Sequence, residues 1–230
     1  MTIGRESFER MYDVVGAPPM PWDIGGPQPE VVRLAEAGGF SGDVADIGCG
    51  LGGNTVFLAS RGVRVIGLDL APSAIVQART RAPEVPFDVA DALTLDAREA
   101  RYDTVLDCAL YHCLGDEDRR RYAATLHGAT RPGARLHVLC FSPEARGLFP
   151  TQYLVTEANL RDTLAPHWTV DRLENALYTT TDTVDELRVR AAAILGQAAD
   201  GPTSGTLTAD AHGRVLVPVW SLTATRRQGA

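Results

Sequence analysis

Glycines alternate along the stretch Asp46-Ile47-Gly48-Cys49-Gly50-Leu51-Gly52, which lies between an apolar run and a helical pattern. Glycine permits a tight turn and lets the backbone approach a ligand closely. The free N–H groups at the start of the following helix can receive polar atoms of that ligand. This stretch therefore predicts a loop that holds a nucleotide-like molecule. A dinucleotide fingerprint would read G-x-G-x-x-G, which the alternating glycines do not match.

Aspartates follow three successive apolar runs of the sequence. Asp46 ends the first run, Asp69 ends the second and Asp91 follows the third. Ligands of open α/β sheets bind at the carboxyl ends of the strands, where these acids are expected. A carboxylate at position 46 would oppose a pyrophosphate and attract an ammonium group, so we expect a cationic ligand. Asp69 has the position of the acid that receives ribose hydroxyls, although both it and Asp91 could simply cap helices.

The stretch "DCALYHCLGDEDRRRYA" leaves the fourth apolar run, which contains Asp107. His112 could accept a proton from a hydroxyl or a ring N–H, because its ordinary pKa suits that task near neutrality. Tyr111 could orient the same substrate. The alternative for His112 is a structural histidine that caps the helix or satisfies a backbone carbonyl.

These residues need a scaffold of alternating strands and helices. Short apolar runs, often β-branched, alternate with helical patterns, which is typical of βαβ units and a parallel sheet. The predicted strands are 42–48, 64–69, 86–91, 102–110 and 134–142, and the predicted helices are 54–61, 73–81 and 117–130, with "RPGAR" ending the last helix. A helix at 156–164 and two strand-like runs, 168–180 and 213–227, follow, separated by a helix-prone segment, 183–199, and a loop, 200–213.

The pattern predicts an α/β fold with a Rossmann-like, seven-stranded, mostly parallel sheet and helices on both faces. The last strand is expected to be antiparallel, with the two final strands as neighbours at one edge of the sheet. At 230 residues the chain fits a single domain. We divide that domain into an N-terminal lid with helices (1–41), a ligand-binding core (42–141), and substrate-side elements with the last two strands (142–230).

Composition excludes several classes of partner. The formal net charge of −7 disfavours sequence-independent binding to nucleic acid or to an anionic membrane. The 4 cysteines include no C-x-x-C pair, and we expect neither a disulfide framework nor a metal site. There is no signal-peptide pattern and no apolar stretch of about 18 residues, so we expect a cytoplasmic protein.

Taken together, the loop, the acids and the "YDTVLD" strand resemble class I S-adenosylmethionine-dependent methyltransferases over about residues 42–141. The resemblance implies S-adenosylmethionine as the cofactor. It also implies that the loop 48–52, with Gly48 and Gly50, lies under the methionine moiety and that Asp107 lies near the methionine and sulfonium end. Asp69 would bind the ribose, and Asp91 with Ala92 would contact the adenine. Asp46 and Leu70 are further candidates for cofactor binding.

A narrower resemblance lies in "MPWDIGGPQPEVV", residues 20–32, which looks like a segment of the small-molecule thiol, thiopurine and halide methyltransferases, including bacterial enzymes acting on heterocyclic toxins. In that group the segment folds over the cofactor, so Trp22 is a candidate contact. A buried structural tryptophan is the alternative. The chain has neither an N/D-P-P-Y/F motif nor an acidic metal cluster, which favours a small-molecule acceptor and no required metal.

We therefore expect a methyltransferase that acts on an aromatic or heterocyclic O, N or S acceptor, with a thiol or halide acceptor as the alternative. A nicotinamide-dependent oxidoreductase would need a Tyr-x-x-x-Lys pair, and the chain contains no lysine. A non-catalytic cofactor-binding regulator stays open at this point, as do the acceptor atom and the choice between monomer and homodimer.

Overall fold

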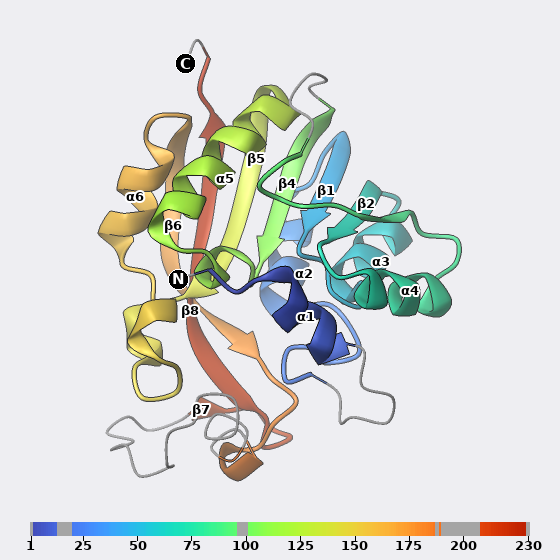
Figure 1. Cartoon of the computed structure of the whole chain (residues 1–230), viewed down its shortest axis with the longest axis vertical. Coiled ribbons are helices and arrows are strands. Elements are labelled where there is room, and N and C mark those ends of the chain that lie inside the picture. Colours follow the sequence, from blue (N-terminus) through green and yellow to red (C-terminus); the bar gives the residue numbers. More distant parts are fainter. Residues whose placement is uncertain (1, 13–19, 96–100, 187–188, 190–207, 229–230) are drawn as a thin grey trace.

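The computed structural model describes residues 2–12, 20–95, 101–186, 189 and 208–228. Its centre is one sheet with the strand order β3-β2-β1-β4-β5-β8-β6, and the short β7 pairs with β8 (Figure 1). The strands are β1 Asp43–Ile47, β2 Arg64–Asp69, β3 Phe87–Val89, β4 Tyr102–Cys108, β5 Thr130–Phe141, β6 Trp168–Thr179, β7 Thr208–Ala209 and β8 Val215–Arg226.

β1 to β5 are parallel, and β8 runs antiparallel to both β5 and β6. The predicted antiparallel pair at one edge is confirmed: β8 lies between β5 and β6, and β6 is the edge strand. The predicted count of seven strands is corrected to eight, because β7 adds two residues within the stretch expected to be a loop. The predicted helix at 183–199 lies mostly outside the described residues.

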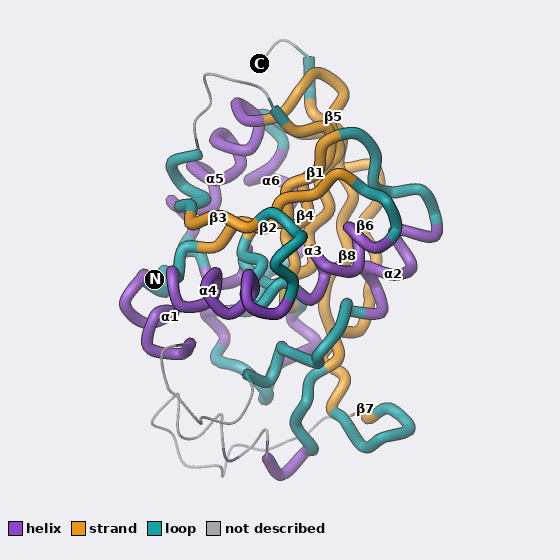
Figure 2. The backbone as a smooth tube through the Cα atoms, turned by 90° about the vertical axis from the view of Figure 1, so that its right-hand side faces the viewer, coloured by secondary structure: helices purple, strands orange, loops and turns teal. Residues whose placement is uncertain are grey.

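Helices cover both faces of the sheet. The α-helices are α1 Arg5–Tyr12, α2 Pro29–Glu36, α3 Gly53–Ser60, α4 Pro72–Arg81, α5 Asp116–Ala129 and α6 Glu157–Leu164, and the 3₁₀ turns are η1 Tyr111–Cys113, η2 Pro143–Ala145 and η3 Thr151–Tyr153. Figure 2 shows strands between α5 on one side and α2 and α3 on the other. Alternate residues of each central strand enter the two cores, as Ala45 packs with α5 and Val44 with α2 and α3.

Local sequence explains where these helices begin. Thr156 accepts a hydrogen bond from the backbone N–H of Asn159 at 3.1 Å and so caps α6. α4 begins with Pro72, whose missing N–H costs nothing at the first helical position. The predicted end of the helix before "RPGAR" is confirmed within one residue, since α5 ends at Ala129, but the strand begins earlier than predicted. β5 begins at Thr130, directly after α5, and its pairing with β4 shifts between Tyr102 and Thr104.

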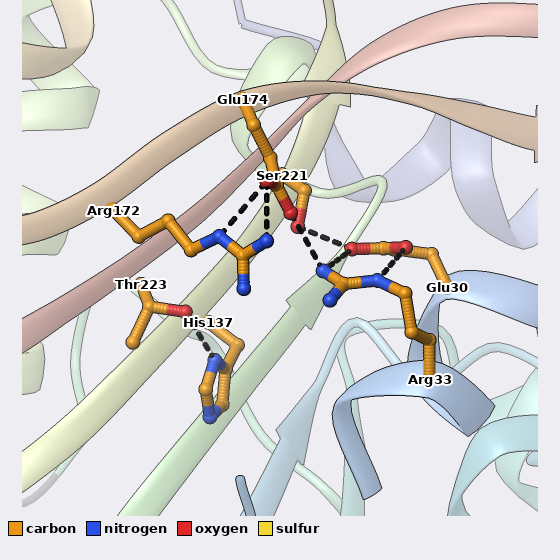
Figure 3. A network of polar contacts seen from close by, with 7 residues as sticks. All are labelled: Glu30, Arg33, His137, Arg172, Glu174, Ser221 and Thr223. Carbon is orange, nitrogen blue, oxygen red and sulfur yellow. Dashed lines mark hydrogen bonds and ion pairs between the residues drawn. The ribbon is translucent and has the colours of Figure 1, made fainter. Parts of the chain in front are cut away.

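A polar network fastens α2 to the sheet (Figure 3). Glu30 accepts a hydrogen bond from Ser221 of β8 at 2.6 Å and pairs with Arg33, which reaches Glu174 of β6 at 2.8 Å. Just before α2, the Gln28 side chain both donates to and accepts from the Thr179 backbone at 2.9 Å. These contacts fix the N-terminal segment against the end of β6, where it borders the site described next.

Candidate active site

A cavity of about 660 Å³ lies at the carboxyl ends of β1, β2 and β4. Its walls come from the glycine loop after β1, the N-terminal segment, the turn after β4 and the stretch after β5. Eight of the predicted site residues line it, namely Trp22, Gly48, Gly50, Asp69, Leu70, Asp91, Ala92 and His112. The other three, Asp46, Tyr111 and Asp107, are buried beside it and do not line it.

The glycine loop needs a backbone conformation that other residues avoid. Gly50 has φ +53°, and a Cβ atom there would lie 3.0 Å from the Tyr12 hydroxyl. The loop is held to β2, because the Gly48 N–H donates to the Leu68 carbonyl at 2.7 Å and the Gly50 N–H donates to Asp69 at 2.8 Å. The second Asp69 oxygen accepts from the Ala71 N–H at 2.9 Å. The Asp69 carboxylate is therefore fixed in place, with further lone pairs left for a ligand.

Asp46 lies under this loop. It is 1% exposed, and its Oδ2 accepts from the Thr55 hydroxyl at 2.6 Å. Its Oδ1 is buried and has no hydrogen-bond partner among the described residues. Burial raises the pKa of the Asp46 carboxyl to about 7. A buried acceptor without a partner suits a cationic or hydrogen-bond-donating group beside the loop.

Asp91 and Ala92 follow β3 and line the cavity. The Asp91 carboxylate accepts from the Leu93 backbone N–H at 2.9 Å, so it organises its own turn while lining the cavity. Both functions proposed from the sequence, a local cap and a ligand contact, are compatible with this position.

Asp107 is the last acid of the predicted cofactor site and lies in β4. It is fully buried, and its Oδ1 accepts from the backbone N–H groups of Leu110 at 2.9 Å and Tyr111 at 3.1 Å. The carboxylate thus holds the turn after β4, in which Ala109 has φ +82°. Burial raises the pKa of Asp107 to about 7. Asp107 lies beneath the cavity wall and does not line the cavity.

Tyr111 is also turned away from the cavity. It is 1% exposed, the Arg119 guanidinium lies 5.2 Å from its ring centroid, and its hydroxyl is 3.4 Å from Asn159 Oδ1. The expected contact with a substrate is therefore corrected to a packing role under the turn. In this 3₁₀ turn Tyr111 packs in the core, whereas the next two residues, His112 and Cys113, line the cavity.

His112 faces the cavity and is 6% exposed. Its ring stacks on Phe141, with centroids 3.8 Å apart and an interplanar angle of 15°, and Phe141 stacks in turn on Phe149 at 4.1 Å. Burial lowers the pKa of His112 to about 3, with a smaller contribution from Arg119. The imidazole is therefore neutral near pH 7, and it forms one end of an aromatic wall.

The N-terminal segment covers the glycine loop. Trp22 lines the cavity, and its Nε1–H donates to the Tyr12 hydroxyl at 3.0 Å. α1 is fastened to α4, because Gln77 donates to the Tyr12 carbonyl at 2.8 Å. Tyr12, together with Phe8 and Met11 of α1, is a lining residue that the sequence interpretation missed. The spacing of these three residues, i, i+3 and i+4, is the signal that could have indicated an apolar helix face over the site.

The described residues offer neither a metal cluster nor a membrane-spanning helix. They contain no group of three or more His, Cys, Asp or Glu residues arranged to hold a metal ion. In the same part of the chain, no helix combines the length and apolar character needed to cross a membrane.

The Rossmann-like sheet, the glycine loop and the strand-end acids define a class of cofactor-binding α/β enzymes, the methyltransferases. Residues 44–133 match the family model described as "Methyltransferase domain". The chain is 39% identical to the 2-heptyl-1-hydroxyquinolin-4(1H)-one methyltransferase of Mycobacteroides abscessus, over 70% of this chain and 74% of that protein. It is 28% identical to probable thiol methyltransferase 2 of Arabidopsis thaliana, over 64% of this chain and 67% of that protein.

A solved structure agrees over nearly the whole chain. It comes from work on the conversion of a disulfide bond into a thioacetal group during echinomycin biosynthesis. The TM-score is 0.78 at 32% sequence identity, and the match covers 99% of this chain and 94% of that one. The chain belongs to the S-adenosylmethionine-dependent methyltransferases and is an enzyme that methylates a small molecule, with S-adenosylmethionine as its cofactor.

Proposed function

We propose that the acceptor is a flat aromatic heterocycle that carries a hydroxyl or a carbonyl oxygen. The observation that carries this proposal is the stacked series His112, Phe141 and Phe149 on the cavity wall. Aromatic faces favour other flat rings in offset or stacked arrangements. The similarity to the Mycobacteroides abscessus protein, which is named for a hydroxyquinolone, supports the same class of acceptor.

The residues around the glycine loop fit S-adenosylmethionine. The Asp46 carboxyl, buried beneath the loop, favours a cationic ligand over an anionic one in the cavity beside it, and a cavity of about 660 Å³ falls within the usual range for small-molecule sites. We assign the glycine loop, Gly48 and Gly50, to the methionine moiety, with Trp22 and Tyr12 over it. Asp69 and Leu70 would bind the ribose, and Asp91 and Ala92 the adenine.

S-adenosylmethionine supplies a methyl group already activated by the sulfonium. The chain's own task is then to hold and orient the acceptor and to exclude water from it. We assign the exclusion of water to the N-terminal segment, because Trp22 and Tyr12 are hydrogen-bonded to each other above the loop. Asp107 contributes by holding the turn that presents His112, and it is a positioning residue.

A thiol acceptor is a second candidate, favoured by the similarity to the plant protein named as a probable thiol methyltransferase. The cavity walls suit aromatic thiols as well as hydroxylated rings. Cys49, Cys108 and Cys113 line the cavity, and burial raises the pKa of each thiol, so none of them is suited to act as a nucleophile near neutral pH.

For the whole protein we further propose a single domain that works in the cytoplasm as a monomer or homodimer, without nucleic acid or membrane partners. The net charge of −7 supports the lack of nucleic-acid binding. Light scattering during size-exclusion chromatography would measure the oligomeric state, and a larger assembly would contradict this proposal.

The experiment for the proposed acceptor is a screen of the purified protein with S-adenosylmethionine. The panel contains hydroxylated quinolones, aromatic thiols and iodide, and mass spectrometry detects S-adenosylhomocysteine and the methylated product. We expect turnover with the hydroxylated heterocycles to exceed that with the other acceptors. Turnover confined to thiols or iodide would overturn the proposal in favour of the alternative.

A further inference from the structure

The position of the hydrogen atom on His112 decides what this residue can do. The 3₁₀ turn that carries His112 is held by Asp107, and the ring lies flat against Phe141. Because the His112 ring stacks on Phe141, the protein fixes the plane of the ring, and both ring nitrogens lie in that plane. The contacts of each nitrogen can therefore be assigned separately.

Nδ1 points back into the protein. The backbone N–H of Phe141 donates a hydrogen bond to His112 Nδ1 at 3.4 Å. A backbone amide can only donate through its N–H, so Nδ1 must present a lone pair and carry no hydrogen. The ring is neutral because burial, together with the charge of Arg119 on α5, lowers its pKa to about 3. A neutral imidazole has one hydrogen, and here that hydrogen belongs to Nε2.

Nε2 has no hydrogen-bond partner among the described residues, and His112 lines the cavity. We propose that His112 is a hydrogen-bond donor in the acceptor site, and that its Nε2–H binds an oxygen lone pair of the acceptor. This inference rests on the proposed function. The oxygen is either the ring carbonyl or the ionised hydroxyl of the heterocycle, because both present a lone pair in the plane of a flat ring.

In this tautomer His112 does not act as a general base, which is one of the two roles considered from the sequence. A general base needs a lone pair facing the substrate, and Nε2 has none in this form. In this form His112 stabilises an acceptor that reacts as its oxyanion. The oxygen lone pair forms the new O–CH₃ bond while the S–CH₃ bond of the sulfonium breaks with its electron pair on sulfur, and no proton remains for His112 to remove. We therefore expect selection for heterocycles whose hydroxyl is already ionised near neutral pH.

The first test reads the tautomer directly in the wild-type protein. A long-range ¹H–¹⁵N correlation spectrum of ¹⁵N-labelled protein distinguishes the two neutral forms, and His112→Gln identifies the signals by their loss. We expect the Nε2–H form, unchanged between about pH 5.5 and pH 8, since the pKa lies far below this range. An Nδ1–H form, or a titration within this range, would overturn the proposal.

The second test uses paired variants and acceptor binding. His112→Phe keeps a stacked ring without a donor, and His112→Gln keeps an N–H donor. For a hydroxyquinolone binding to the protein loaded with S-adenosylhomocysteine, we expect His112→Phe to raise Kd on the order of 10- to 100-fold. His112→Gln should recover most of that loss. Equal Kd values for wild type and His112→Phe would overturn the proposal.

Binding of different acceptors distinguishes the two oxygens that His112 could bind, the ring carbonyl and the ionised hydroxyl. A quinolone without the hydroxyl tests the carbonyl, and a hydroxylated ring without the carbonyl tests the oxyanion. His112→Phe should weaken the binding of at least one of these two acceptors and leave the binding of an aromatic thiol unaffected. Unchanged affinity for S-adenosylhomocysteine shows that the variants are folded. A wild-type enzyme that methylates no heterocycle refutes the proposed function. If the wild type does methylate a heterocycle but His112→Phe and His112→Gln bind it with identical Kd, only the donor role is refuted.

Discussion

Replacing Gly50 by alanine should destabilise the protein through a contact with Tyr12. The new Cβ atom would lie 3.0 Å from the Tyr12 hydroxyl oxygen, and Gly50 has φ +53°. The left-handed conformation costs about 1–2 kcal/mol in an alanine, and overpacking adds about 1–3 kcal/mol. Gly62→Ala is a matched control, because Gly62 has φ +79° and open space around its Cβ position. We expect Gly50→Ala to lower the free energy of unfolding more than Gly62→Ala by about 1–3 kcal/mol.

A double-mutant cycle isolates the contact. In Tyr12→Phe the hydroxyl is gone, and the next atom in the original geometry, Cζ, lies 3.8 Å from the Cβ position, an ordinary van der Waals distance. The overpacking cost of Gly50→Ala should then largely disappear in the Tyr12→Phe background. Urea unfolding of the four proteins measures each free energy of unfolding. Additivity within about 0.5 kcal/mol would refute the placement of Tyr12 on the glycine loop.

Three further variants test other parts of the structure. Asp107 has a folded-state pKa of about 7, above its ordinary 3.8, so its stabilising contribution is complete below about pH 4 and is lost as the pH rises toward 7. Asp107→Asn keeps the oxygen and cannot ionise. In urea unfolding, its free energy of unfolding relative to that of the wild type should therefore rise by about 1.4 kcal/mol per pH unit between pH 5 and pH 7. A difference between the two proteins that does not change with pH would contradict the burial argument. Trp22→Phe removes the donor to the Tyr12 hydroxyl and should weaken S-adenosylmethionine binding by about 1 kcal/mol in calorimetry, and an unchanged affinity would exclude Trp22 from the roof of the site. Glu30→Ala leaves the Ser221 hydroxyl without its partner and should cost about 1–3 kcal/mol in urea unfolding, whereas a neutral effect would show that the network of Figure 3 does not stabilise the α2 contact.

The elements of the cofactor site were predictable because their signals are local. The glycine loop lies between a β-branched strand and a helix, and Asp69 and Asp91 follow strands, so parallel pairing brings them to one edge. The sequence interpretation placed β2 and β6 within one residue of their observed bounds. Local periodicity is a sufficient guide to strands that lie in a buried sheet.

The remaining features depend on contacts between distant parts of the chain. Asp107 lies in the fourth strand and His112 follows it five residues later, but the sequence does not say which side chain caps the turn and which faces the cavity. The Nδ1 contact of His112 comes from Phe141, on another strand. Tyr12 reaches Gly50 only because α1 packs on α4. The position of β8 between β5 and β6 is likewise a tertiary outcome, since periodicity carries no information on strand order.

The cofactor site is tested most directly by calorimetric titration of S-adenosylmethionine into wild type, Asp69→Ala and Asp88→Ala. Asp69 lines the cavity, whereas Asp88 is an exposed neighbour on β3 and serves as the control. We expect saturable binding to wild type and Asp88→Ala with equal Kd, and a Kd raised about 10- to 100-fold for Asp69→Ala. Equal affinity for Asp69→Ala and wild type, or a wild-type protein that prefers NAD, would contradict the assignment of this cavity to S-adenosylmethionine.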